Sequence, residues 1–147
     1  MRSAGAQTMH RLFMHPQPVV MACTGHALAA GALILLTGDT RIGVRGDFKI
    51  GLNETAIGLA LPVYGLEFAK ARMPADQLTA NVIQARLHDP ESAVKAGYLD
   101  AVVERDALME TALARASALA EISGEAYATV KRRLRGQASK IIAESLA

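Results

Sequence analysis

The 147-residue sequence contains no tryptophan, and only 4% of its residues are aromatic. Its core must therefore be built from Ala, Leu, Val and Ile, which favours closely packed helices and parallel strands. Hydrophobic residues nevertheless make up 51% of the chain and charged residues 20%. Disordered chains have lower hydrophobicity and higher net charge, so this composition predicts a folded globular domain.

Cysteine is also scarce, because Cys23 is the single one and it lies in an apolar segment. One cysteine excludes a disulfide framework and a CxxC metal site. His10, His15 and His88 are scattered along the sequence and suggest no metal site. We expect Cys23 to be a small buried hydrophobe rather than a nucleophile, in a reduced, cytoplasmic protein.

Acidic residues are missing from the first part of the sequence, where none occurs before Asp39. Residues 16–38 carry no charge when histidine is neutral. A membrane-spanning helix over 19–37 is one interpretation, and a transit or signal peptide is another. Because Gly25 and Gly31 interrupt the run, we favour a buried strand, a turn and a buried helix, with no membrane segment.

The net charge is only +2, and basic residues gather near the C-terminus at Lys131, Arg132, Arg133 and Arg135. We expect these four residues to form a solvated helix face. A contact with an anionic ligand, such as a nucleotide phosphate, is the alternative. No aromatic residues are interleaved with them, so we expect no nucleic-acid binding.

The apolar periodicity and the turn residues predict strands early in the chain and helices late. Strands are predicted at 18–24, 40–44, 47–50 and 99–103. Helices are predicted at 4–14, from about 29 to 37, and at 63–72, 74–87, 89–97, 106–122, 125–134 and 137–146. The fold class that follows is an α/β layer with a helical C-terminal region.

Four segments of the sequence follow one another in an order that one enzyme family shares. Residues 18–31 match a proline, an apolar strand, a glycine, an aromatic position and a Gly-rich turn into a helix. Residues 39–42 are similar to D-x-R-I, 48–58 to F-G-x-P-E-x-x-x-G, and 93–103 to A-x-x-x-G-L-V-x-x-V. Together these segments, which cover most of 18–103, resemble the C-terminal part of the crotonase (enoyl-CoA hydratase/isomerase) domain.

This resemblance implies a truncated spiral of β-β-α turns, followed by helices used for trimerisation. Residues 1–103 would form a partial core without the usual N-terminal part of the domain, and 104–147 the trimerisation region. Family members bind acyl-CoA thioesters and stabilise an enolate, so the implied partner is an acyl-CoA. Coenzyme A is then part of the substrate, no separate cofactor is expected, and the implied assembly is a homotrimer or a dimer of trimers.

The predicted turn at residues 29–31 suits such chemistry. The first N–H groups of a helix lack internal partners and lie at the positive end of its dipole. They can therefore stabilise a thioester oxygen that develops negative charge. The resemblance assigns one oxyanion-hole donor to the backbone of Ala30. The family's second donor comes from a loop that precedes the segment present here, and the sequence shows no match for it.

The resemblance leaves one of the family's two catalytic carboxylates. Family hydratases use two glutamates to orient and split the added water. One of these positions matches Leu33 and the other matches Glu54. One carboxylate suffices to move a proton from C2 to C4 of a 3-enoyl thioester. The resemblance therefore implies Glu54 as the catalytic residue of an isomerase-type proton transfer rather than of hydration.

Several other residues are candidates for lining the substrate site. They are His26, Gly31, Leu33, Asn53, Ile57 and Tyr64. Leu33 and Ile57 are equally well explained by apolar packing, and His26 by a hydrogen bond within the fold. Glu54 has a structural alternative too, in which its carboxylate caps nearby loop N–H groups. We expect Asp39 to be a structural carboxylate.

A second hypothesis is that the chain is a non-catalytic fragment that serves in oligomerisation or binding. Without the N-terminal part of the domain, an exposed sheet edge and apolar helix faces are expected. The sequence therefore predicts self-association, to which residues 74–146 contribute much of the contact.

Overall fold

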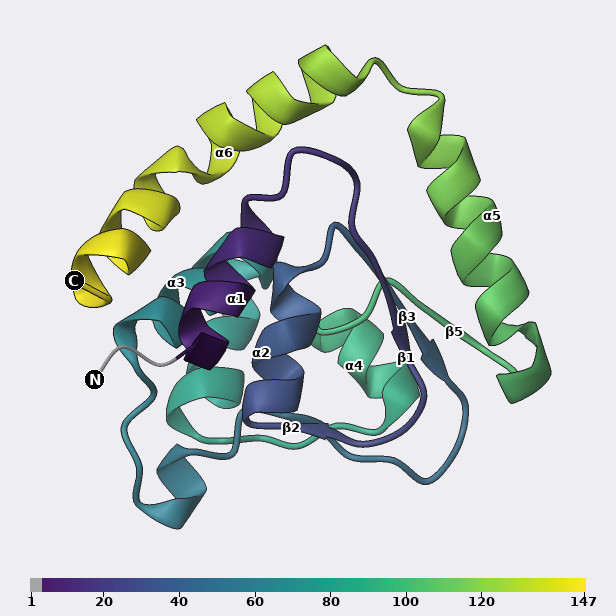
Figure 1. Cartoon of the computed structure of the whole chain (residues 1–147). Helices are drawn as coiled ribbons and strands as arrows, with labels where there is room; N and C mark the ends of the chain where they lie inside the picture. The colour runs from purple at the N-terminus through teal and green to yellow at the C-terminus, as the bar shows by residue number, and fades with distance from the viewer. Residues whose placement is uncertain (1–3) are drawn as a thin grey trace.

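Two small parallel sheets form the centre of the computed structural model, which describes residues 4–147 (Figure 1). The strands are Val20–Cys23 (β1), Ala27–Leu28 (β2), Thr40–Val44 (β3), Ile50–Gly51 (β4) and Ala101–Val103 (β5). One sheet has the order β1-β3-β5, and β2 pairs with β4 in the other. All three pairings in these sheets are parallel, so the strands are connected through helices and loops that pack on the sheets.

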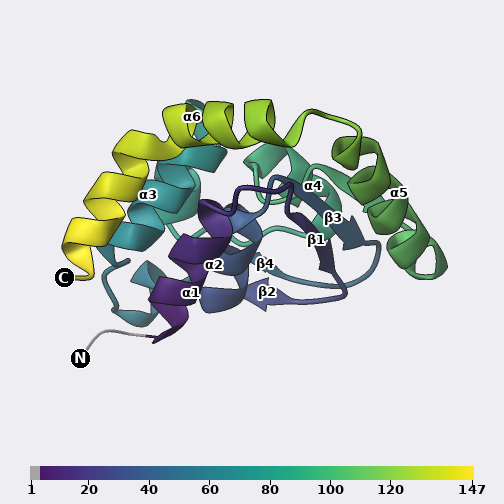
Figure 2. The same cartoon turned by 45° about the horizontal axis from the view of Figure 1, so that its top comes forward.

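Within the described residues, six α-helices surround these sheets. They are Ala4–Phe13 (α1), Ala30–Thr37 (α2), Val63–Arg72 (α3), Pro90–Ala96 (α4), Leu108–Ala120 (α5) and Gly124–Ser145 (α6). Helix α5 packs on β1 and β3, and α6 crosses over α3 and α1 (Figure 2). The expected α/β fold with a helical C-terminal region is confirmed.

Helix α2 accounts for the uncharged run that resembles a membrane span. It is apolar all round, and Leu33 and Leu36 are 3% and 0% exposed in the main hydrophobic core. The core also contains Phe13 and Phe68, whose rings lie 5.0 Å apart. A helix that is apolar on every side is buried by its neighbours. In the part of the chain that the structure describes, no helix has the length and apolarity needed to span a bilayer.

The predicted helix over 74–87 is wrong. The chain instead forms a 3₁₀ turn at Ala75–Gln77 and a π-helical turn at Thr79–Ile83. Asn81 is fully buried there, and its side-chain amide donates to the Ala96 carbonyl at 3.0 Å and hydrogen-bonds His88 at 2.8 Å. These tertiary hydrogen bonds outweigh the local helical preference of the segment.

Two helices were expected at 125–134 and 137–146, but α6 is continuous. Gly136 lies within it, and nothing is within 4 Å of where its Cβ would stand. An interior glycine costs about 1 kcal/mol. Burial of Arg135 on one side of Gly136 and Ile142 on the other offsets that cost. The strand expected at 47–50 is also shorter and displaced, because β4 covers Ile50–Gly51.

A buried ion cluster fastens α6 to the body. Lys131 Nζ lies 2.5 Å from Asp39 Oδ2, and Arg135 Nη2 lies 2.9 Å from Asp39 Oδ1. The Val19 N–H donates to the same carboxylate at 2.9 Å. The three charged side chains are only 6–8% exposed. Asp39 is therefore a structural carboxylate, as expected.

The predicted solvated face of α6 is wrong for half of its basic residues. Arg132 and Arg133 are exposed, but Lys131 and Arg135 point into the protein. Lys131 also donates to the carbonyls of His15 (2.7 Å) and Gln17 (3.0 Å). A buried cation needs such partners, and sequence spacing alone does not reveal them.

The pKa of Asp39 shows how strongly this carboxylate is held. Burial alone would raise that pKa, but the hydrogen bonds from Lys131 and Val19 and the charge of Arg135 together lower it. Burial lowers the pKa of Lys131, and the positive charge of Arg135 lowers it further, although the hydrogen bond and the charge of Asp39 oppose this shift. The cluster therefore stabilises the charged form of the Asp39 carboxylate.

We predict that Asp39→Asn lowers the free energy of unfolding at pH 7 by about 3 kcal/mol, because two buried cations lose their counter-charge. The depressed pKa makes this contribution full above the unfolded-state value of about 3.9, and it is lost as pH falls further. Urea titrations of both proteins from pH 7 to pH 3 measure it. A difference that does not shrink below pH 4 would contradict the assignment.

The turn from β2 into α2 holds a strained residue. Ala29 has φ 48° and ψ −115°, a region that side chains with a Cβ rarely adopt. Its N–H donates to the Gly51 carbonyl at 3.1 Å, and its carbonyl accepts the Leu33 N–H at 3.0 Å. These two bonds hold the backbone in the strained conformation, so the turn keeps its shape without a glycine.

Ala29→Gly is expected to increase the free energy of unfolding by about 1 kcal/mol, because glycine removes the Cβ clash at positive φ. The matched control is Ala114→Gly, at an exposed position inside α5. There glycine should reduce stability by about 1 kcal/mol. Chemical denaturation measures both changes, and the same sign for the two variants would contradict strain at Ala29.

Candidate functional site

The candidate site forms where β2 and β4 end side by side. The Ala27 N–H donates to the Lys49 carbonyl at 3.0 Å, and Leu28 lies opposite Gly51 in the parallel register. Parallel strands leave their sheet at the same edge. The chain after β2 therefore enters α2 at the edge where the chain after β4 turns into the loop that carries Glu54.

The N-terminus of α2 offers unpaired N–H groups at this edge. Ala30 is the first residue of the helix and is exposed, and Ala29 provides no side-chain cap. The first N–H groups of a helix have no partner within the helix, and the dipole adds positive potential there. This end of α2 can therefore stabilise an oxygen that becomes negatively charged.

Glu54 contributes a buried carboxylate at the same edge. The residue is 9% exposed, and its Oε2 atom has no hydrogen-bond partner among residues 4–147. It precedes the 3₁₀ turn Thr55–Ile57 but its side chain caps no N–H group of that turn. The capping alternative is therefore not what the structure contains. An unpaired buried carboxylate oxygen is free to accept a proton or a hydrogen bond from a bound molecule.

Two contacts hold the backbone just before Glu54, and sequence reasoning predicted neither of them. Ile50 and His88 form an antiparallel bridge with two backbone hydrogen bonds of 2.9 Å. The Leu52 N–H donates to the hydroxyl of Tyr98 at 3.1 Å. The only sequence signal was that Tyr98 stands where the family pattern has leucine.

Some of the predicted site residues lie together. Gly31 follows Ala30 in the first turn of α2, and Asn53 precedes Glu54. The Asn53 Oδ1 atom is buried and has no hydrogen-bond partner in the described part of the chain, like the neighbouring Oε2 of Glu54. Two adjacent unsatisfied oxygens mark this loop, because buried polar atoms are almost always paired.

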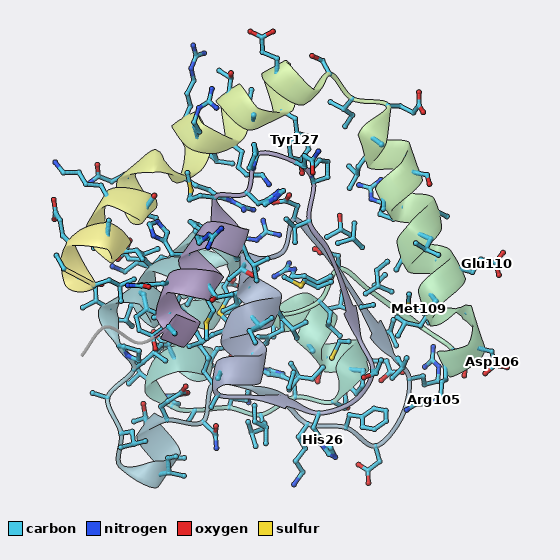
Figure 3. The ribbon with its side chains drawn as sticks, in the orientation of Figure 1. His26, Arg105, Asp106, Met109, Glu110 and Tyr127 are labelled. Carbon is cyan, nitrogen blue, oxygen red and sulfur yellow. The ribbon has the colours of Figure 1, made fainter. Side chains whose placement is uncertain are left out.

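Other predicted site residues have packing contacts instead. His26 is exposed, accepts the Lys49 N–H at 3.0 Å, and stands edge-on to the Phe48 ring (Figure 3). Leu33, where the family hydratases have a glutamate, is 3% exposed in the core. The Tyr64 ring packs 6.2 Å from that of Phe68.

Large apolar side chains are exposed on the segments that border the site. These are Leu28 at 37%, Ile57 at 60%, Leu59 at 58% and Val63 at 45% exposed. They lie on β2, on the loop that follows Glu54, and at the start of α3. An apolar surface around a carboxylate and an uncapped helix suits a molecule with a polar reacting group and a hydrocarbon chain.

A cavity of about 410 Å³ lies in a different place, under α6. Its lining includes Asp39, Arg72 and Tyr127, and it includes neither Ala30 nor Glu54. Figure 3 shows Tyr127 near the start of α6, far from His26. This cavity belongs to the ion cluster that fastens α6. Among residues 4–147 no group of three or more His, Cys, Asp or Glu side chains could hold a metal ion.

Comparison with known proteins shows which family the chain resembles in sequence and fold. The family model for enoyl-CoA hydratase/isomerase matches residues 1–147. An enoyl-CoA hydratase/isomerase family protein from Pseudomonas syringae superposes with a TM-score of 0.93 at 39% identity. An enoyl-CoA isomerase from Mycobacterium tuberculosis gives 0.91 at 34%, and an enoyl-CoA hydratase from Mycobacterium ulcerans gives 0.91 at 32%.

Each of these comparisons covers 97% of this chain and 62% of the other one. The chain thus spans about three-fifths of the length of these relatives. Their names include both isomerase and hydratase, so the shared fold does not separate the two activities. The match of the family model over the whole sequence, together with these structural relatives, shows that the chain belongs to the enoyl-CoA hydratase/isomerase family.

Proposed function

We propose that this chain carries the proton-transfer base and one oxyanion donor of an enzyme that acts on acyl-CoA thioesters. The observation that supports this most is the position of Glu54, whose unpaired buried carboxylate oxygen shares a sheet edge with the uncapped N-terminus of α2. A base and an anion-stabilising group at one edge are the two components that enolate chemistry needs.

In the proposed reaction Glu54 removes a proton from C2 of a 3-enoyl thioester. The electron pair of the C–H bond moves toward the thioester oxygen, where the Ala30 N–H stabilises the negative charge. One such donor is typically worth about 2.7–4 kcal/mol in the transition state. Return of the same proton to C4 shifts the double bond and restores the carboxylate.

The single carboxylate favours isomerisation over hydration. Hydration requires a water molecule to be both oriented and split, for which the family hydratases use two glutamates. Leu33, at the position of one of them, has an apolar side chain in the core. We expect the acyl chain to lie along Leu28, Ile57 and Leu59, and the protein to act in the cytoplasm.

Glu54→Gln is expected to reduce deuterium exchange at C2 of a non-hydratable acyl-CoA in D₂O by about 100-fold or more, because the amide cannot take the proton. Glu110→Gln, at an exposed position of α5 far from the site, is the matched control and should exchange like the parent chain. Exchange that survives in Glu54→Gln would exclude Glu54 as the base. An absence of exchange and of CoA binding in the parent chain would mean that this chain alone is not catalytic.

A role in assembly is the second candidate function, and exposed apolar residues on α5 and α6 favour it. Met109 and Leu113 are 58% and 62% exposed on α5, and Val130 and Leu134 are 60% and 80% exposed on α6. Apolar side chains exposed in this number along two helices are typical of a contact surface. We propose that these faces join copies of the chain, as a trimer or a dimer of trimers.

Sedimentation equilibrium tests this assembly. The parent chain should sediment as an oligomer, and the double variant Leu113→Glu/Leu134→Glu should shift toward the monomer because charges cannot be buried at a contact. Ile83→Glu, 65% exposed on the π-helical turn, is the control and should leave the oligomer intact. A parent chain that is monomeric at micromolar concentration would contradict the proposal.

A further inference from the structure

We propose that Tyr98 is a positioning residue for Glu54, an inference that rests on the proposed base role of Glu54. Tyr98 lies in the connection between α4 and β5, and its side chain is fully buried. Its hydroxyl oxygen accepts the Leu52 N–H at 3.1 Å. Leu52 stands two residues before Glu54, so the hydroxyl fixes the backbone from which the base projects.

No other group in the described chain satisfies this N–H. Leu52 is 1% exposed, which keeps bulk water away from its backbone. Leucine, the residue of the family pattern at this position, has no oxygen to offer. A buried N–H without a partner costs about as much as a lost hydrogen bond, so without the hydroxyl the loop would move to find another acceptor.

The ring of Tyr98 packs against His88, which belongs to a buried hydrogen-bond network. The His88 ring lies 5.9 Å from the Tyr98 ring, and His88 Nε2 is 2.8 Å from Asn81 Oδ1. The Asn81 amide nitrogen donates to the Ala96 carbonyl at 3.0 Å, so its Oδ1 faces His88 as an acceptor. His88 Nε2 must therefore carry the proton, which fixes the orientation of the imidazole ring.

The loop is thus clamped at two points. The backbone of His88 binds Ile50, and the hydroxyl of Tyr98 binds Leu52. His88 and Tyr98 lie on either side of α4, and the residues that they bind lie shortly before Glu54 in the chain. A rigid backbone just before a catalytic side chain restricts where its carboxylate can lie, and a displacement of about 1 Å can cost about 100-fold in rate.

The electrostatics of Tyr98 agree with this geometry. Burial raises the pKa of Tyr98 to about 12, the Leu52 N–H opposes this rise, and the negative charge of Glu54 adds to it. The hydroxyl therefore stays neutral and available as an acceptor at physiological pH.

The test compares Tyr98→Phe with Tyr127→Phe. The second variant also loses a hydroxyl interaction, but it is that of the half-buried Tyr127 with Asp39 in the α6 ion cluster. Two quantities are measured in both variants. Amide hydrogen exchange over 50–57 reports the loop without any catalysis, and C2 deuterium exchange of an acyl-CoA reports the rate and KM separately.

For Tyr98→Phe we expect faster amide exchange confined to 50–57, and about a 10-fold lower C2 exchange rate at saturating thioester with KM unchanged. Tyr127→Phe should leave both quantities at the parent values. If Tyr98→Phe does not fold, Tyr98→Leu removes the hydroxyl with the residue of the family pattern.

Unchanged amide exchange over 50–57 in Tyr98→Phe would overturn the positioning role, whatever the C2 exchange shows. A faster loop with an unchanged C2 exchange rate would overturn it as well. If the parent chain itself shows no C2 exchange, the proposed function fails. The amide exchange then still decides whether Tyr98 holds the Glu54 loop.

Discussion

The candidate site depends on one short pairing, the parallel contact of β2 with β4. Two backbone hydrogen bonds, from Ala27 to Lys49 and from Ala29 to Gly51, bring together two segments that lie far apart in the chain. They align the start of α2 with the loop of Glu54 at one edge. The strained φ of Ala29 is a consequence of this alignment, because the chain must turn sharply to begin the helix.

The two buried carboxylates, Asp39 under α6 and Glu54 at the candidate site, have different surroundings. Under α6 the carboxylate of Asp39 is fully engaged with Lys131 and Arg135, and it serves to hold a helix in place. At the candidate site the carboxylate of Glu54 has an unpaired oxygen although it is buried. Buried polar atoms are almost always paired, so an unpaired oxygen on Glu54 supports the proposed role of this residue in binding or chemistry. The neutral hydroxyl of Tyr98 accepts a hydrogen bond from the backbone just before Glu54 and adds no charge to the site.

Sequence patterns predicted the fold class and most element boundaries, because motif order and local periodicity carry that information. The catalytic pairing of Ala30 with Glu54 stays a prediction. The patterns failed where long-range contacts decide the local structure. The buried amide of Asn81 bonds Ala96 and His88 and so prevents the helix expected at 74–87. The bond between Leu52 and Tyr98 joins residues 46 positions apart, and no local pattern encodes it.

The proposed function requires that the end of α2 and Glu54 together hold and ionise a thioester. Titration with acetoacetyl-CoA, whose enolate absorbs where its keto form does not, tests this most directly. We expect a saturable enolate absorbance on binding, because the α2 N–H groups stabilise the negative oxygen while Glu54 takes the proton. An absorbance equal to that of the free ligand at saturating protein would contradict it.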